Sequence, residues 1–207
     1  MIAFAAAMGY LEAVCVLYLQ RAISLDPRAL FPVRDASTLD ELATAEVARE
    51  FATLVMLWAV GWFNGRTVIA RLAWTSVAFG IWDVVYYIGL NALIGWPDSL
   101  GTWDLLFMIP TPWAGPIWAP IAVSAFLITF GLLYARAAHR GDGLHLARNE
   151  WITLITGGVI VIIAFCWNAV TVLEYGVPTD FPVPVFAVGM LLGAMAALRP
   201  LRRVHTP

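Results

Sequence analysis

The apolar run from Leu72 to Ile94 is the feature that most restricts what this chain can fold into. It is long enough to cross a bilayer as a helix, for which about 20 apolar residues suffice. Asp83 lies near its middle, where an aspartate costs about 2.5–3.5 kcal/mol to insert. We therefore expect the polar face of this helix to point into a helix bundle or a wet cavity and not at lipid.

Other apolar runs repeat this pattern, and 61% of all residues are hydrophobic against 13% charged. Ordinary soluble domains are about 45–50% apolar. The first run starts without a basic region and is not followed by a cleavage motif, so we interpret it as a retained span. We predict an all-α polytopic membrane bundle, one transmembrane domain over residues 1–207, with six spans: 2–19, 51–63, 72–94, 117–138, 151–173 and 185–198.

The segment from Trp96 to Trp113 does not fit this pattern. Its apolar core, Leu105 to Ile109, is far too short to cross the bilayer. We expect a short interfacial or re-entrant helix here, capped by Ser99 or Thr102, with its tryptophans at headgroup depth.

Arginine is distributed unevenly between the two sides of a six-span protein, and the chain contains no lysine. One side has Arg66, Arg71, Arg136, Arg140, Arg148, Arg199, Arg202 and Arg203; the other has Arg21, Arg28, Arg34 and Arg49. Because basic loops stay in the cytoplasm, we predict cytoplasmic termini, and we expect a bacterial inner membrane as the location.

Several functional classes lack the residues they need. The net charge of −2 excludes a basic nucleic-acid surface. Cys15 and Cys166 fall inside predicted spans without metal-ligand spacing, and the histidines all fall in polar segments. The chain has no clustered acidic motif for Mg²⁺ or Ca²⁺ and no HExxH, so we predict neither a metal nor a cofactor.

Polar residues inside the spans are the candidate site. Asp83, Tyr87 and Asn91 share one helix face, and Glu46 and Glu50 share another. Carboxyls gathered at this depth would stay partly protonated at neutral pH, which suits general acid catalysis. The candidate catalytic residues are Asp83, Glu12, Glu46, Glu50 and Glu174; the candidate substrate-binding residues are Trp82, Tyr86, Tyr87, Asn91 and Asn168.

Each candidate also has a purely structural interpretation. Asp83 and Asn168 suit hydrogen bonds between helices. Glu46 and Glu50 flank Arg49 and suit a solvated helix start, while Asp104 and Glu174 suit exposed loops, where a carboxylate needs no further explanation.

The segment Phe79-Gly80-Ile81-Trp82-Asp83-Val84-Val85-Tyr86 resembles the Trp-acid-x-x-Tyr segment of the integral-membrane terpene cyclases of meroterpenoid pathways. The resemblance implies a small polytopic protein whose membrane carboxyls protonate an isoprenoid epoxide or alkene. It also implies a second catalytic acid in a late span, which only Glu174 matches. The family usually has glutamate where this chain has Asp83, and it tends to have seven spans.

Three functions fit these observations. The first is an intramembrane enzyme or binding protein for an isoprenoid or lipid-like substrate. The second is an accessory subunit that docks on a membrane-protein partner through its tryptophan- and proline-rich loops. The third is a small proton- or cation-coupled transporter, for which paired broken spans or inverted repeats would be evidence.

Overall fold

The computed structural model describes residues 1–22, 36–109, 111–175 and 180–205. Helices make up most of this part of the chain. The elements are α1 (Ile2–Ala22), α2 (Ala36–Asn64), α3 (Val68–Ile94), β1 (Trp103–Phe107), β2 (Trp113–Pro116), α4 (Trp118–Arg140), α5 (Arg148–Cys166), α6 (Ala169–Tyr175) and α7 (Val183–His205).

The protein is an integral membrane helical bundle. Among the described residues, five helical segments are long and apolar enough to cross a membrane: α1, α3, α4, α5 continued into α6, and α7. Of the six predicted spans, the one in α2 does not meet this standard. That helix is 29 residues long, but its first half carries Glu46, Arg49 and Glu50, which lower its hydropathy.

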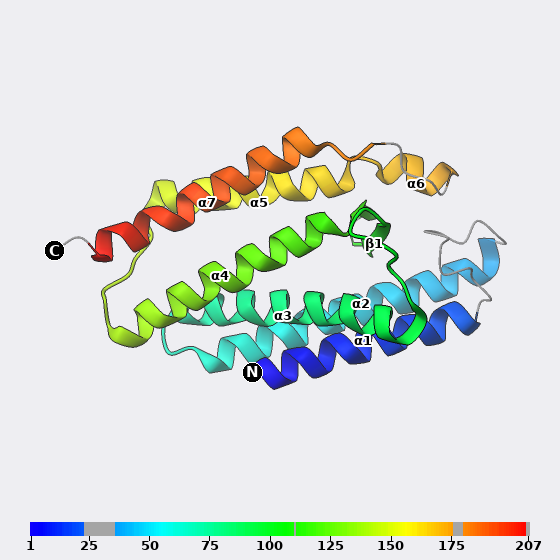
Figure 1. Ribbon diagram of the computed structural model, residues 1–207, viewed down its shortest axis with the longest axis horizontal. Coiled ribbons are helices and arrows are strands. Elements are labelled where there is room, and N and C mark those ends of the chain that lie inside the picture. The colour runs from blue at the N-terminus through cyan, green and yellow to red at the C-terminus, as the bar shows by residue number, and fades with distance from the viewer. Residues whose placement is uncertain (23–35, 110, 176–179, 206–207) are drawn as a thin grey trace.

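The long helices alternate in direction along the bundle axis (Figure 1). Helices α1, α3 and α5 run one way, and α2, α4 and α7 run back. Helix α3 packs against α1, α2 and α4, whereas α5 and α7 pack mainly against each other and touch the rest more lightly. The bundle therefore consists of a group built around α3 and a separate α5–α7 pair.

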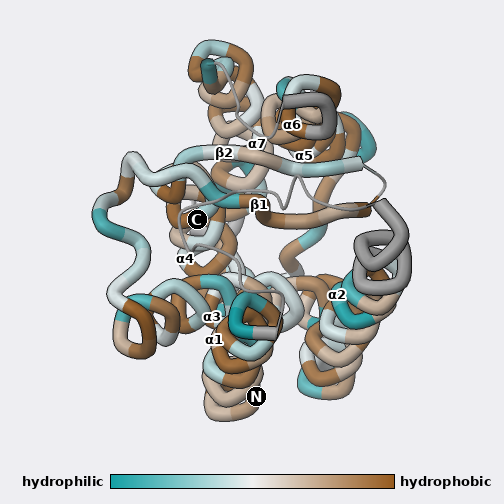
Figure 2. Tube along the Cα trace, turned by 90° about the vertical axis from the view of Figure 1, so that its right-hand side faces the viewer, coloured by the Kyte–Doolittle hydropathy of each residue, from teal (hydrophilic) through white to brown (hydrophobic). Residues whose placement is uncertain are grey.

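The predicted interfacial helix is wrong, because β1 (Trp103–Phe107) and β2 (Trp113–Pro116) pair as an antiparallel β-hairpin. In its register Trp103 pairs with Pro116 and Asp104 with Gly115. Aromatic residues favour strands, and the prolines at 110 and 112 are incompatible with a continuing helix. Pairing the two strands satisfies backbone groups that a helix this short could satisfy only in part. The hairpin lies across one end of the bundle, between the α5–α7 pair and helices α1–α3 (Figure 2).

The opposite end of the bundle carries the turn between α2 and α3, the link from α4 to α5, and the end of α7. The eight arginines that the sequence analysis assigned to one side are in these segments or next to them. The hairpin end and the arginine end are therefore distinct.

Candidate functional site

Asp83 is buried between α3 and α4. Thr67 caps the start of α3 by accepting a hydrogen bond from Ala70 N–H, and Gly95 ends the helix with φ 67°. Asp83 is only 6% exposed, and Ser124 Oγ on α4 donates a hydrogen bond of 2.6 Å to its Oδ2. In the described part of the chain, no cation lies within salt-bridge distance of this carboxyl.

Gly80 explains why Ser124 comes so close. A Cβ at position 80 would lie 2.8 Å from the Ser124 carbonyl oxygen and 2.7 Å from the Ile128 side chain. Any larger residue would push α3 and α4 apart at this level. One turn further along α3, the same close approach brings Asp83 to the Ser124 hydroxyl.

Asp104 forms a second buried carboxyl, held over the end of α3 by strand β1. Tyr87 OH donates to Asp104 Oδ2 at 2.8 Å, and the Asp104 residue is 9% exposed. Burial raises the pKa of Asp104 to about 6, although hydrogen bonds from Tyr87 and from the Leu105 N–H oppose the rise. The expectation that Asp104 lies in an exposed loop is wrong, because the hairpin folds it inward.

Arg49 neutralises two of the candidate acids. Its guanidinium forms ion pairs with Glu12 on α1 and with Glu46 one turn earlier on α2. Arg49 Nε donates to Glu46 Oε2 at 2.9 Å, and Thr53 Oγ1 donates to Glu12 Oε2 at 3.3 Å. Charges at membrane depth commonly pair in this way. Glu12 and Glu46 are therefore parts of an ion-pair network that joins α1 to α2.

Glu50 holds the hairpin. Both of its carboxylate oxygens accept from the Met108 N–H, at 3.2 and 3.0 Å. The neighbouring residue Phe107 packs over α3, with its ring centroid 6.3 Å from Phe79 and 6.2 Å from Trp82. The tip of the hairpin is thus fixed to α2 by a charge-assisted hydrogen bond and to α3 by aromatic contacts.

Tyr86 and Trp82 form an aromatic pair on α3. Their rings are stacked, 6.3 Å apart with an interplanar angle of 16°. The indole N–H of Trp82 is buried and has no acceptor among the described residues, which is unusual for a buried donor.

The remaining candidates have separate roles or positions. Asn91 Nδ2 donates to the Pro97 carbonyl at 3.1 Å, beyond the end of the buried face. Asn168 lies at the break between α5 and α6, where its Nδ2 donates to the Asp180 carbonyl at 3.0 Å. The side chain of Glu174 lies outside the described residues. The structure thus brings Asp83, Tyr86 and Tyr87 together with Trp82 and places Asn91 and Asn168 elsewhere.

Sequence reasoning missed Ser124 and Asp104. Ser124 is an isolated hydroxyl in an apolar span and has no neighbouring signal in the sequence. Asp104 is the one buried residue of strand β1, and its burial depends on the pairing of β1 with β2. Among the described residues, no group of three or more His, Cys, Asp or Glu is arranged to hold a metal ion.

Comparisons with known proteins add no relative: no family model, curated protein or solved structure matches this chain. The likeness of residues 79–86 to the membrane terpene cyclases therefore stays a prediction.

Proposed function

We propose that this protein is an intramembrane enzyme that acts by acid catalysis on an isoprenoid or other lipid-like substrate, with Asp83 as the proton donor. The observation that carries the proposal is the difference between Asp83 and the other acids. Glu12 and Glu46 are paired with Arg49, whereas Asp83 has a single hydroxyl partner and no described cation.

The chemistry follows from that difference. A carboxyl buried in an apolar environment without a cation costs much less free energy as the neutral acid than as the carboxylate. A neutral acid can donate a proton. Asp83 would transfer its proton to an alkene or epoxide of the substrate, and the carboxylate left behind would keep the Ser124 hydrogen bond. The carboxylate regains a proton when the substrate cation loses one to form the product.

The surrounding aromatic rings suit a cationic intermediate. A cation over the face of tryptophan or tyrosine is stabilised by about 0.5–2 kcal/mol, with the larger values in desolvated sites. Trp82, the residue before Asp83 on α3, stacks on Tyr86, and Trp113 lies near Phe107 and Phe165. Tyr87 connects this group to Asp104, which we propose as the second acid in place of Glu174.

The proposed orientation follows the arginines. We propose that both termini face the cytoplasm of a bacterial inner membrane, because the arginine end would then be cytoplasmic. The hairpin, Asp83 and Asp104 would then lie in the outer half of the membrane or at its outer surface.

The test is a deuterium-incorporation assay in proteoliposomes made in D₂O, with a panel of prenyl alcohols, prenyl epoxides and unsaturated lipids. The wild-type protein should place solvent deuterium on carbon in one member of the panel. Asp83→Asn should slow this by about 10²–10⁴-fold, since that is what a positioned general acid contributes. The matched control is Asp98→Asn, which changes an exposed aspartate near the same end.

Two results would contradict the proposal. One is full activity in Asp83→Asn, which would remove the acid from its central role. The other is a wild-type protein that deuterates nothing in the panel while Asp83→Asn folds and assembles normally, which is what an accessory subunit would do. Proton uptake into the vesicles that depends on Asp83, without any product, would favour the transporter.

A further inference from the structure

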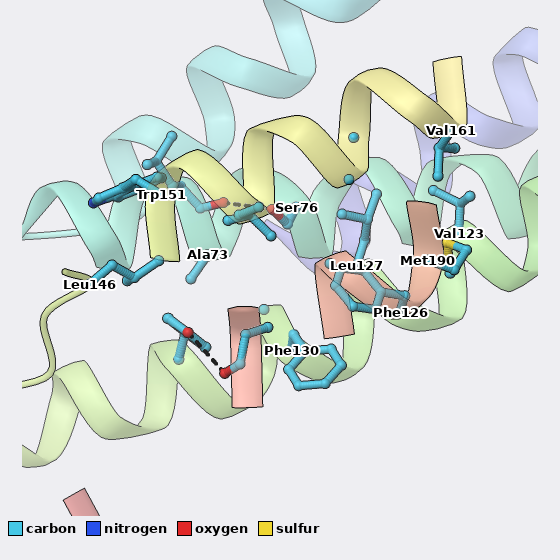
Figure 3. Close-up of a pocket in the computed structure, with 18 of the residues that line it drawn as sticks. Ala73, Ser76, Val123, Phe126, Leu127, Phe130, Leu146, Trp151, Val161 and Met190 are labelled. Carbon is cyan, nitrogen blue, oxygen red and sulfur yellow. Dashed lines mark hydrogen bonds between the residues drawn. The ribbon is translucent and has the colours of Figure 1, made fainter. Parts of the chain in front are cut away.

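An apolar cavity of about 380 Å³ separates the α5–α7 pair from α3 and α4 (Figure 3). Helices α5 and α7 touch each other at Gly157 and Gly189, where an added Cβ would come within 2.8 Å of backbone. That close contact keeps the pair together, while its packing on α4 is lighter. The cavity occupies the level of the bundle between the arginine end and Asp83.

The cavity walls have few polar groups. The lining is almost entirely aliphatic and aromatic, with Ser76 and Tyr134 as its hydroxyl groups. Ser76 Oγ already donates to the Leu72 carbonyl at 3.0 Å, and Tyr134 OH to the Ala197 carbonyl at 3.0 Å. Water needs two to four polar partners to occupy a cavity, so a hydrocarbon is the natural occupant at membrane depth.

One end of the cavity lies near Asp83. Ser76 lines it, and Asp83 lies seven residues later on nearly the same face of α3, about 10 Å further along the helix. On α4, Val123 lines the cavity and the next residue, Ser124, is hydrogen-bonded to Asp83. The end of the cavity that Val123 lines therefore lies next to the part of α4 that is hydrogen-bonded to Asp83.

We infer that this cavity binds one hydrocarbon chain of a lipid-like molecule, with the end of the chain directed at Asp83. The binding of the chain stands on the cavity alone, whereas the direction of its reactive end rests on the proposed function. Pockets of this size and character suit a ligand held mainly by apolar contacts.

Gly158 provides a way to fill the cavity. It is among the lining residues, and a Cβ there would meet no atom within 4 Å, so a leucine side chain has space. Its neighbour Val159 is 49% exposed and is not part of the lining. The pair Gly158→Leu and Val159→Leu therefore separates filling of the cavity from a change in the outer helix surface. Ser76→Phe fills the cavity from the opposite wall.

The experiment uses two photoreactive probes, a diazirine-bearing hexadecanol and a diazirine-bearing farnesol, added to the protein in phosphatidylcholine vesicles. Labelled residues are mapped by mass spectrometry. We expect saturable labelling of Ser76, Leu127 and Met190 by at least one probe, and the preferred probe identifies a straight or a branched chain. Gly158→Leu and Ser76→Phe should each lower this labelling by ~10-fold or more, as expected when an apolar binding volume is filled. Val159→Leu should leave it unchanged.

The inference is overturned if labelling is confined to lipid-facing residues such as Ile155, or if neither filling variant changes it. It is also overturned if the filling variants dissociate a dimer, because a second copy would then occupy the cavity. Asp83→Asn should bind both probes like the wild type. Normal labelling together with full activity in Asp83→Asn would reject the proposed chemistry and leave the binding site intact.

Discussion

Four carboxyls at the hairpin end of the bundle differ in what neutralises or binds them. Glu46 is held by an arginine, Glu50 by a backbone N–H, Asp83 by a serine hydroxyl and Asp104 by a tyrosine hydroxyl. Only the arginine brings a full opposite charge. Asp83, whose described partner is a neutral hydroxyl, is therefore costly to ionise, which suits it to the role of proton donor.

The stability of the protein should depend on pH through Asp104. Its pKa is raised from 3.8 to about 6, mainly by burial, so the folded state favours the protonated carboxyl. Its contribution is fully present below pH 3.8 and is lost as pH rises through about 6. Asp104→Asn should therefore match the wild type near pH 3.5 and exceed it at pH 8 by up to about 3 kcal/mol.

The measurement is the difference in Tm between Asp104→Asn and the wild type in detergent, followed from pH 3.5 to 8. Taking the difference cancels the titration of the other acids, and Asp98→Asn provides a solvent-exposed control. A difference that stays constant across this range would show that Asp104 does not titrate as its burial requires.

The sequence predicts part of this arrangement and not the rest. The insertion cost of Asp83 and the four-residue spacing to Tyr87 are local properties, and both residues are buried on α3. Their partners depend on tertiary packing. Gly80 lets α4 approach closely enough for Ser124 to reach Asp83, and the hairpin places Asp104 over α3, next to Tyr87. Neither partner is near Asp83 or Tyr87 along the chain, so no periodicity connects them.

At the scale of elements, the hairpin is the part that sequence patterns describe least well. The apolar segment from Leu105 to Ile109 is equally consistent with a strand or a buried helical turn. The segment forms a strand because it pairs with Trp113–Pro116 and because Phe107 packs against aromatic residues on α3. The hairpin then positions a carboxyl, Asp104, and its fixation to α2 depends on Glu50.

Removing the Glu50 carboxylate should release the hairpin tip. Glu50→Ala leaves the Met108 N–H without its acceptor, a loss worth about 1–3 kcal/mol for a bond to a charged group. We expect faster hydrogen–deuterium exchange in peptides covering residues 103–116, with exchange in α4 unchanged. Glu50→Gln keeps one acceptor oxygen and should exchange at an intermediate rate. Equal exchange in all three proteins would mean that the aromatic contacts alone fix the hairpin.

At the scale of the whole molecule, α2 is the helix whose place in the membrane needs explanation. The hydropathy of α2 is lower than that of the five clear spans. The helix nevertheless runs antiparallel to α1 and packs along α3. The Glu12–Arg49–Glu46 network reduces three charges to a net of one and satisfies most of their hydrogen bonds. Pairing of this kind lowers the insertion cost that a hydropathy sum assigns to each charge separately.

The crossing of α2 decides the topology, because it sets the parity of the bundle. If α2 crosses, both termini lie on the same side, and the arginines predict that this side is the cytoplasm. If α2 lies outside the membrane, the two termini face opposite sides.

We expect green fluorescent protein to fluoresce when fused at either terminus, and alkaline phosphatase to be active when inserted after Leu100, an exposed residue near the hairpin. Arg49→Ala should lower the fluorescence of the N-terminal fusion and not that of the C-terminal fusion. The reason is that two unpaired glutamates at membrane depth would oppose insertion of α1 and α2. Termini found on opposite sides in the unaltered protein would exclude α2 as a span and would put Glu12, Glu46 and the hairpin on different sides of the membrane from those proposed.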